Sequence, residues 1–300
     1  MSKHSEQQSQ TLSYFRGIAE EWRQRAEGDV SGKVNTIAQR NSCVLRSAEN
    51  LDPIGKFLDI GCGSGELVIA MAERKVDSVG VDFAAEMIEL CCNKSKDKGI
   101  TNVEFVLGSI FDYRAEDSSF DMISGQGLIE YISADEFNQL IKCCRNWLRP
   151  GGKLVLGSRN RLFNLFSQNA YTELELRLNA VDALLTEAVT IGSAATFADA
   201  IEVLGQSSVN FPSPDAHPDT GIDVTARHQY TPGELIRLLS KAGFKTETIF
   251  PVHYQSLPPD FANANAQLHT DMAEHLFDIA PEDHRLIPSS STFVIVADKV

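Results

Sequence analysis

The chain has 300 residues, of which 43% are hydrophobic, and a formal net charge of −14 at pH 7. No apolar run approaches the roughly 18 residues of a membrane span, and the polar start MSKHSEQQSQT lacks the apolar segment of a signal peptide, so we expect a cytoplasmic protein without membrane contact. The negative charge argues against nucleic acid, whose phosphates are bound by clustered Lys and Arg side chains, and favours a small-molecule ligand.

The middle of the chain alternates between predicted strands and helices. The first strand is expected at 56–60, followed by a helix at 65–74, and the pattern then continues with strands 77–82, 103–108, 120–124 and 153–158 and helices 84–99 and 133–147. A later helix begins at Thr231 and precedes strands 245–250 and 291–298. Seven strands in this order predict an α/β fold with helices on both faces of a mostly parallel sheet. Its ligands should bind at the carboxyl ends of the strands.

Three segments lie outside this pattern. Residues 1–50 form an expected N-terminal helical lid, and the domain proper, 51–300, contains insertions at about 160–229 and 251–290. The first insertion opens with a long amphipathic segment, TELELRLNAVDALLTEAVT. We interpret the insertions as lids over the ligand edge of the sheet, with a homodimer interface as the alternative.

Six cysteines are present, and none of them forms a CxxC pair. This spacing favours reduced, packed thiols over a metal or redox site.

The stretch KFLDIGCGSGE, residues 56–66, places a glycine turn at the end of the first strand. It lacks the Gly-Lys-Ser/Thr of a phosphate-binding loop, and its G-x-G-x-G spacing departs from the G-x-G-x-x-G of dinucleotide sites. Asp59 and Glu66 flank the turn, and two carboxylates there would repel a pyrophosphate and favour a cationic ligand. Asp82, at the end of the second strand, has the spacing of an acid that accepts ribose hydroxyls. S-adenosylmethionine combines a ribose with an ammonium and a sulfonium, so it meets both conditions.

These residues resemble the class I S-adenosylmethionine-dependent methyltransferases of the small-molecule type. The resemblance rests on five segments in family order, LDIGCGSGE, VGVDFAAEMI, FVLGSIFDY, FDMISGQGLIEYI and LRPGGKLVL, which span residues 58–156. It implies a Rossmann-like sheet of order 3-2-1-4-5-7-6 with the last strand antiparallel.

The resemblance also implies which residues hold the cofactor. Asp59 and the turn Gly61, Cys62 and Gly63 would face its methionyl part, and Asp82 its ribose. The adenine would be lined by Phe83, Met87, Ser109 and Ile110, and Gln126 completes the expected set. Ser109 stands where the family usually has an acidic residue, which weakens the expected contact with the adenine amino group.

The cofactor carboxylate calls for a cation, preferably a guanidinium group. Similar N-terminal helices close over the cofactor in related methyltransferases, and we choose Tyr14 and Arg40 as contacts of this kind. A solvated surface position is the alternative for Arg40.

Substrate residues are harder to predict because methyl transfer depends mainly on positioning the nucleophile and removing its proton. Glu130 and Tyr131 stand where the family often has a histidine, and either could orient or deprotonate a substrate, although Glu130 could equally pair structurally. His228 is the best-placed imidazole for proton removal.

After the fifth strand, Arg159, Asn160 and Arg161 suggest an anionic substrate group, with a salt-bridged helix start as the alternative. Tyr230 lies near the same edge and completes the expected substrate residues.

The sequence thus predicts methyl transfer to an oxygen or nitrogen of a small anionic metabolite. One alternative uses the same cofactor for aminocarboxypropyl transfer or cyclisation and releases methylthioadenosine. The other is a cofactor-binding regulatory protein without catalysis.

Overall fold

The computed structural model describes residues 34–49, 51, 53–212, 218 and 227–300, and every structural statement below refers to these residues. Within them, seven strands form one sheet of order β3-β2-β1-β4-β5-β7-β6. The strands are β1 (Lys56–Ile60), β2 (Asp77–Asp82), β3 (Val103–Leu107), β4 (Phe120–Gln126), β5 (Leu148–Arg159), β6 (Phe244–Tyr254) and β7 (Ser290–Lys299). β7 runs antiparallel to β5 and β6, while the pairs among β1 to β5 are parallel. The predicted order and the antiparallel last strand are confirmed.

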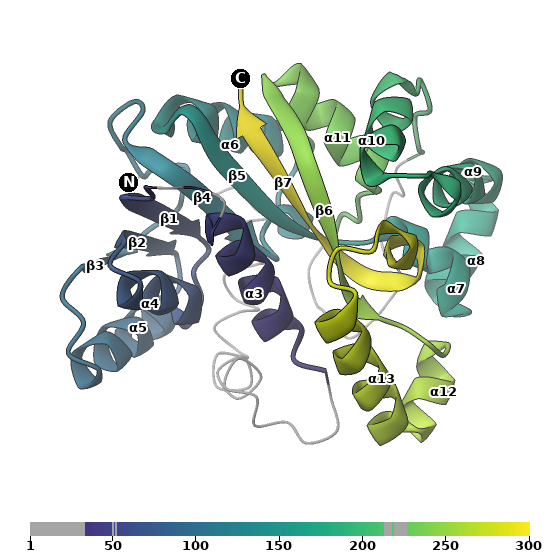
Figure 1. Cartoon of the computed structure of the whole chain (residues 1–300), viewed down its shortest axis with the longest axis horizontal. Coiled ribbons are helices and arrows are strands. Elements are labelled where there is room, and N and C mark those ends of the chain that lie inside the picture. The colour runs from purple at the N-terminus through teal and green to yellow at the C-terminus, as the bar shows by residue number, and fades with distance from the viewer. Residues whose placement is uncertain (1–33, 50, 52, 213–217, 219–226) are drawn as a thin grey trace.

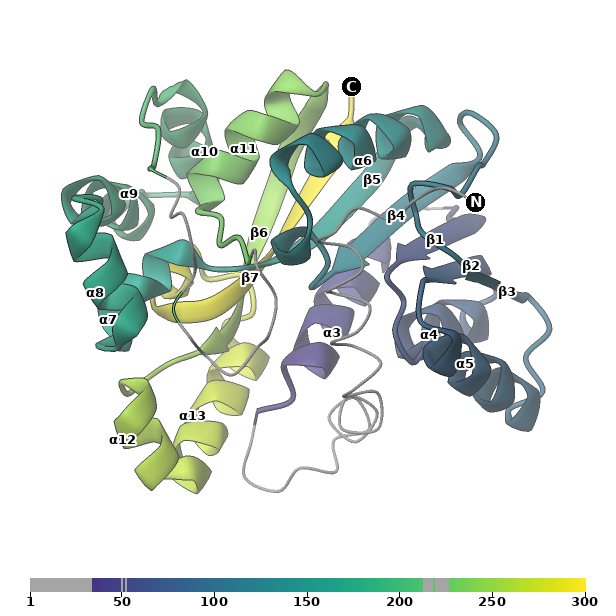
Figure 2. The same ribbon diagram turned by 180° about the vertical axis from the view of Figure 1, so that it is seen from behind.

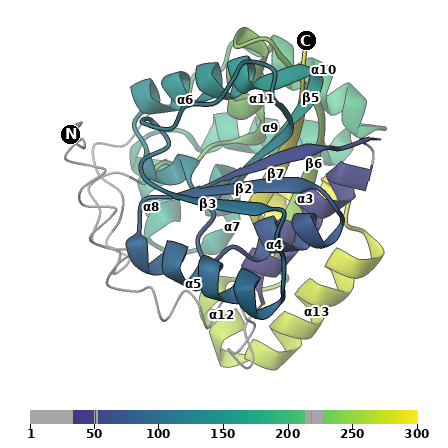
Figure 3. The same ribbon diagram turned by 90° about the vertical axis from the view of Figure 1, so that its left-hand side faces the viewer.

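Helices cover both faces of this sheet, as Figure 3 shows from the side. One face carries α3 (Thr36–Glu49), α4 (Glu66–Glu73) and α5 (Ala85–Asp97), and α3 stands in front of the sheet in Figure 1. The other face carries α6 (Ala134–Trp147) and α11 (Pro232–Lys241), which come to the front in Figure 2. The apolar side chains form separate clusters on the two faces, so the sheet is buried on both sides.

Helix boundaries follow local capping chemistry. Ser133 and Glu136 form a capping box at the start of α6, and Thr231 and Glu234 form another at the start of α11, where Pro232 takes the first helical position. Both helix starts agree with the sequence prediction.

Helix α3 is the described part of the predicted N-terminal lid, and it packs on the sheet. Cys43 and Val44 are fully buried in one cluster with Val294 and Val296 of β7. Because this apolar face packs directly on the sheet, α3 belongs to the layered core of the domain. Residues 1–33 lie outside the described part of the chain.

The first insertion contains α7 (Asn164–Ser167), α8 (Ala170–Arg177), α9 (Val181–Ser193) and α10 (Phe197–Gln206). The amphipathic segment expected as one stretch is two helices, separated near Asn179, which has a φ of 53°. In α9, Glu187 accepts hydrogen bonds from the backbone N–H of Gly233 at 2.7 Å and from the Thr231 hydroxyl at 3.0 Å. The insertion is therefore anchored to the start of α11.

The second insertion contains α12 (Pro259–Ala264), α13 (Ala266–Ile279) and the 3-10 helix η3 (His284–Ser289), and it starts later than expected because β6 continues to Tyr254. Two further 3-10 turns, η1 (Ile129–Tyr131) and η2 (Arg161–Phe163), follow β4 and β5. Among the described residues, none of the helices has the length and apolar character to cross a membrane.

Candidate active site

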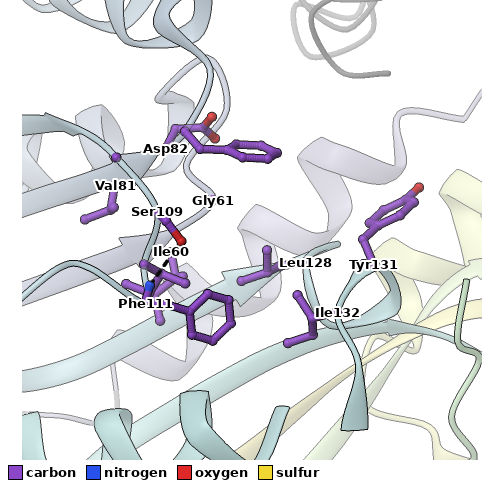
Figure 4. Close-up of a pocket in the computed structure, with 12 residues that line it drawn as sticks. Ile60, Gly61, Val81, Asp82, Ser109, Phe111, Leu128, Tyr131 and Ile132 are labelled. Carbon is purple, nitrogen blue, oxygen red and sulfur yellow. Dashed lines mark hydrogen bonds between the residues drawn. The ribbon is translucent and has the colours of Figure 1, made fainter. Parts of the chain in front are cut away.

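A pocket opens where β1, β2, β3 and β4 end, as expected for a parallel sheet. It encloses about 480 Å³, counting its open mouth. Figure 4 shows Phe111, Leu128 and Ile132 gathered on one side and Asp82 on the other. The lining residues are Ile60, Gly61, Val81, Asp82, Phe83, Gly108, Ser109, Ile110, Phe111, Leu128, Tyr131 and Ile132.

The glycine turn that borders this pocket requires glycine for its backbone conformation. Gly61, Gly63 and Gly65 have φ values of 69°, 51° and 79°, which lie in the left-handed region. At Gly65 a Cβ atom would also lie only 2.7 Å from Sγ of Cys91. The turn is thus tight because of both its backbone conformation and its packing.

Asp82 contacts the glycine turn and also lines the pocket. Its Oδ2 accepts a hydrogen bond from the backbone N–H of Gly63 at 3.0 Å, and its Oδ1 accepts one from Ala84 at 2.9 Å. Burial raises the pKa of the Asp82 carboxyl to about 6, although these backbone hydrogen bonds act to lower it. A carboxylate has about four acceptor sites, so it could still bind a ribose hydroxyl beside these backbone contacts.

Asp59 lies at the end of β1 and is 4% exposed. Burial raises its pKa to about 8, and the nearby Asp82 and Glu66 raise it further, against a hydrogen bond with Ser124. Within the described structure its Oδ1 has no hydrogen-bond partner. Asp59 is not one of the lining residues, but it directly precedes Ile60 and Gly61, which are, and a buried carboxyl with an unused oxygen at this place fits a cationic group of the ligand.

Glu66 contributes less to the negative charge at the glycine turn than the sequence suggested. Its carboxylate pairs with Nζ of Lys94 at 2.5 Å and accepts a hydrogen bond from the Ser64 hydroxyl at 2.8 Å. The case for a cationic ligand therefore depends mainly on Asp59.

At the far end of the pocket, Phe83, Ser109 and Ile110 line the wall as expected. Met87 is buried within α5 and is not one of the lining residues. Phe111 was not predicted, although it follows β3 at a strand end, which is the signal that could have identified it. The Ser109 hydroxyl accepts a hydrogen bond from the backbone N–H of Phe111 at 3.3 Å.

Two other predicted cofactor residues, Cys62 and Gln126, are not among the residues that line the pocket. Cys62 is 8% exposed, and a hydrogen bond with Cys91 together with burial raises the pKa of its thiol. The amide nitrogen of Gln126 donates to the Ser124 hydroxyl at 3.2 Å and to the Val155 carbonyl at 3.1 Å. Both side chains therefore support the turn and the end of β4.

A cluster of charged side chains lies next to the pocket, around Glu130. Nε of Arg227 is 3.4 Å from Oε2 of Glu130, and Nε of Arg159 is 4.0 Å from the same oxygen. Arg40 reaches this place from α3, because a Cβ atom added at Gly127 would lie 2.7 Å from its Nη1. Arg227 was not identified from the sequence, although it directly precedes His228, the predicted proton acceptor.

The structure favours structural roles for two predicted substrate residues. Arg161 is buried and binds Glu175 through Nε at 3.0 Å and Nη2 at 2.8 Å, which is the salt-bridged helix start that the sequence left open. The Asn160 amide donates to the carbonyls of Ile287 at 2.7 Å and Ser290 at 2.9 Å. Because both side chains are engaged within the fold, this geometry gives no support to their predicted contact with a substrate.

The remaining candidates are His228, Tyr230, Tyr131 and Tyr14. The backbone N–H of His228 donates to the Glu130 carbonyl at 2.8 Å, and burial lowers the pKa of its imidazole, so the ring is neutral at neutral pH and able to accept a proton. The Tyr230 ring lies 5.5 Å from that of Phe137, and burial raises the pKa of its phenol. Tyr131 lines the pocket. Tyr14 lies outside the described residues.

Comparison with known proteins agrees with this geometry. Residues 57–152 match a family model described as a methyltransferase domain. A ubiquinone biosynthesis O-methyltransferase from Xanthomonas axonopodis pv. citri (strain 306) is 29% identical over 163 residues, which cover 53% of this chain and 65% of that relative. The chain thus matches just under two thirds of the relative's length.

Solved structures share the fold at low sequence identity. Magnesium protoporphyrin IX methyltransferase from Synechocystis PCC 6803, solved with bound SAH, aligns with a TM-score of 0.57 at 12% identity, over 98% of this chain and 100% of that one. The [4+2]-cyclase SpnF aligns with a TM-score of 0.58 at 15% identity, over 100% of this chain and 98% of that one. The chain thus has the fold of these solved structures, and its residues 57–152 are similar to a methyltransferase domain.

Proposed function

We propose that the protein transfers a methyl group from S-adenosylmethionine to an oxygen or nitrogen of a small anionic metabolite. The observation that carries the proposal is the pair of buried carboxyls at the glycine turn. Asp59 has an oxygen without a partner in the described structure, and Asp82 borders the pocket. A ligand with a cationic amino acid group and a ribose satisfies both.

In this proposal, different residues of the chain bind different parts of the cofactor. Asp82 accepts hydrogen bonds from the ribose hydroxyls, and Phe83, Ser109 and Ile110 enclose the adenine. Asp59 faces the ammonium group, and Arg40 supplies a guanidinium for the carboxylate. When bound, S-adenosylmethionine supplies an electrophilic methyl group on its sulfonium.

The substrate requires a position next to this pocket and a route for its proton. Arg159 supports an anionic substrate, because its Nε is buried and lacks a hydrogen-bond partner among the described residues. The neutral imidazole of His228 accepts the proton that an attacking hydroxyl or amine loses. Tyr131 lies between the pocket and this cluster and helps to orient the acceptor atom.

Calorimetry with S-adenosylhomocysteine tests the cofactor assignment. We expect the protein to bind this ligand and S-adenosylmethionine and to give no binding signal with NAD or ATP, since a pyrophosphate would meet the Asp82 carboxylate and would offer no cation to Asp59. Measurable binding of NAD would contradict the charge argument.

A second candidate is non-methyl chemistry with the same cofactor, because the shared fold includes the [4+2]-cyclase named above, so the fold alone does not fix the reaction. Product analysis separates the candidates. Methyl transfer releases S-adenosylhomocysteine, whereas aminocarboxypropyl transfer releases methylthioadenosine.

A further inference from the structure

The Glu130 cluster brings together charged residues that are far apart in the sequence. Arg40 comes from α3, Glu130 from η1, Arg159 from the end of β5, and Arg227 from the segment before α11. The sheet topology places all four segments at the same edge, next to the pocket residues Leu128 and Tyr131. The cluster therefore faces the place where a substrate must approach the cofactor.

Among the described residues, the cluster is largely buried and holds more guanidinium groups than carboxylates. The side chains of Glu130 and Arg227 are 4% and 5% exposed, while that of Arg159 is 32% exposed. Three guanidinium groups thus surround one carboxylate, and in the described structure Nε of Arg40 and Nε of Arg159 have no hydrogen-bond partner. Buried N–H donors without partners are unfavourable, so the unused donors of Arg40 and Arg159 suit a further anion.

Glu130 is poorly placed to act as a base. Both arginines approach the same oxygen, Oε2, at 3.4 and 4.0 Å. The carboxylate is thus already engaged by two guanidinium groups on one oxygen. Its geometry instead suits a group that fixes the two arginines relative to each other.

We infer that Glu130 is a positioning residue, which holds Arg159 and Arg227 as a two-arginine site for one carboxylate or phosphate group of the substrate. The inference rests on the proposed function, since it places the substrate anion beside the cofactor pocket. Guanidinium groups bind such anions through paired N–H donors, and a fixed orientation lowers the entropy lost on binding.

The rival explanation is that Glu130 merely neutralises part of the positive charge. The two explanations predict opposite effects when Glu130 is replaced. Removing a competing negative charge should strengthen anion binding, whereas removing a positioning contact should weaken it. Gln keeps the acceptor oxygen without the charge, while Met has a similar length and keeps neither.

The test uses the full-length protein saturated with S-adenosylhomocysteine, so that the cofactor carboxylate already occupies its own place. Inorganic phosphate and benzoate are titrated calorimetrically, one probe for each anion type. We expect at least one of them to bind, and Arg159→Gln and Arg227→Gln to weaken that binding at least about fivefold. Arg285→Gln, which removes an exposed arginine paired with Asp283, serves as the charge-matched control and should bind like wild type.

The Glu130 variants then decide the role of the carboxylate. We expect Glu130→Gln to bind the anion as tightly as wild type or more tightly, and Glu130→Met to bind it at least about fivefold more weakly, with S-adenosylhomocysteine affinity unchanged in both. Tighter anion binding in both variants would overturn the positioning role.

Folding and cofactor binding are checked separately. If Glu130→Met does not fold by circular dichroism, Arg159→Lys provides the second test, because it keeps the charge but loses the forked donors and should still weaken binding. Anion binding by wild type that neither Arg159→Gln nor Arg227→Gln reduces, or no anion binding at all, would refute the two-arginine site. A failure of the proposed function shows itself differently, as loss of S-adenosylhomocysteine binding by wild type.

Discussion

Cofactor binding should release a proton from Asp59. The pKa of this carboxyl is raised to about 8, so in the ligand-free protein it is mostly protonated at pH 7. A cationic ammonium group favours the ionised form, and binding should release about 0.9 proton at that pH. Asp82, with a pKa of about 6, should add only about 0.1 proton.

The same linkage sets the pH dependence of affinity. If S-adenosylhomocysteine binds only when both carboxyls are ionised, its dissociation constant should rise by at most about 100-fold between pH 8 and pH 6, mostly through Asp59. In Asp59→Asn the rise should be only about twofold, because Asp82 alone remains to be protonated. Affinity therefore falls as the pH falls, and Asp59 is the main cause.

Isothermal titration calorimetry in two buffers of different ionisation enthalpy measures the released proton directly. Thermal melts of the ligand-free proteins provide a control with a defined sign. A raised carboxyl pKa means that folding stability is lost as the pH rises, so Asp59→Asn should gain in melting temperature relative to wild type from pH 5 to pH 8. Equal proton release by wild type and Asp59→Asn would refute the assignment of Asp59 to the ammonium group.

Three further changes test other parts of the site and fold. Asp82→Ala should weaken S-adenosylhomocysteine binding at least about tenfold in calorimetry, because two charge-assisted hydrogen bonds are each worth about 1.5–3 kcal/mol before water fills the gap; wild-type affinity would contradict the ribose assignment. Burial raises the pKa of Glu187 to about 7, so its ionisation in the folded protein is unfavourable. The unfolding free energy of Glu187→Gln, measured in urea melts, should therefore increase relative to that of wild type between pH 5 and pH 8, by at most about 3 kcal/mol. A difference between the two proteins that does not change with pH would count against this. Gly65→Ala should cost at least about 2 kcal/mol from its left-handed backbone and the clash with Cys91. A second change, Cys91→Ala, should recover part of that loss, and a fully stable Gly65→Ala protein would contradict the packing argument.

The sequence predicted the sheet well, and it also located several residues that line the pocket, because both depend on local patterns. Strand ends and glycine turns are encoded in short segments, so Asp59 and Asp82 could be identified without any partner from elsewhere in the chain. Phe111 also follows the end of a strand, but it was not predicted. The position of a strand end can thus be predicted more reliably than which of the residues next to it face the pocket.

The contacts of the charged residues around Glu130 could not be predicted, because these contacts are made with distant partners. Arg161 and Arg159 look alike in the sequence, yet only Arg161 meets Glu175, a residue of α8, in a buried ion pair. Arg227 became visible as a site residue only through Glu130, which lies 97 positions earlier in the chain. Periodicity and spacing carry no information about such pairs.

The contact between α3 and β7 also has a consequence for biosynthesis. Cys43 and Val44 emerge from the ribosome early, but Val294 and Val296, which complete their cluster, emerge some 250 residues later. Because domains fold as units and synthesis proceeds at about 5–20 residues per second, the apolar face of α3 lacks these partners for at least about ten seconds on each nascent chain. During that interval the helix is exposed to chaperones and to other nascent chains. Its apolar face is protected from aggregation only after the last strand, β7, has been synthesised.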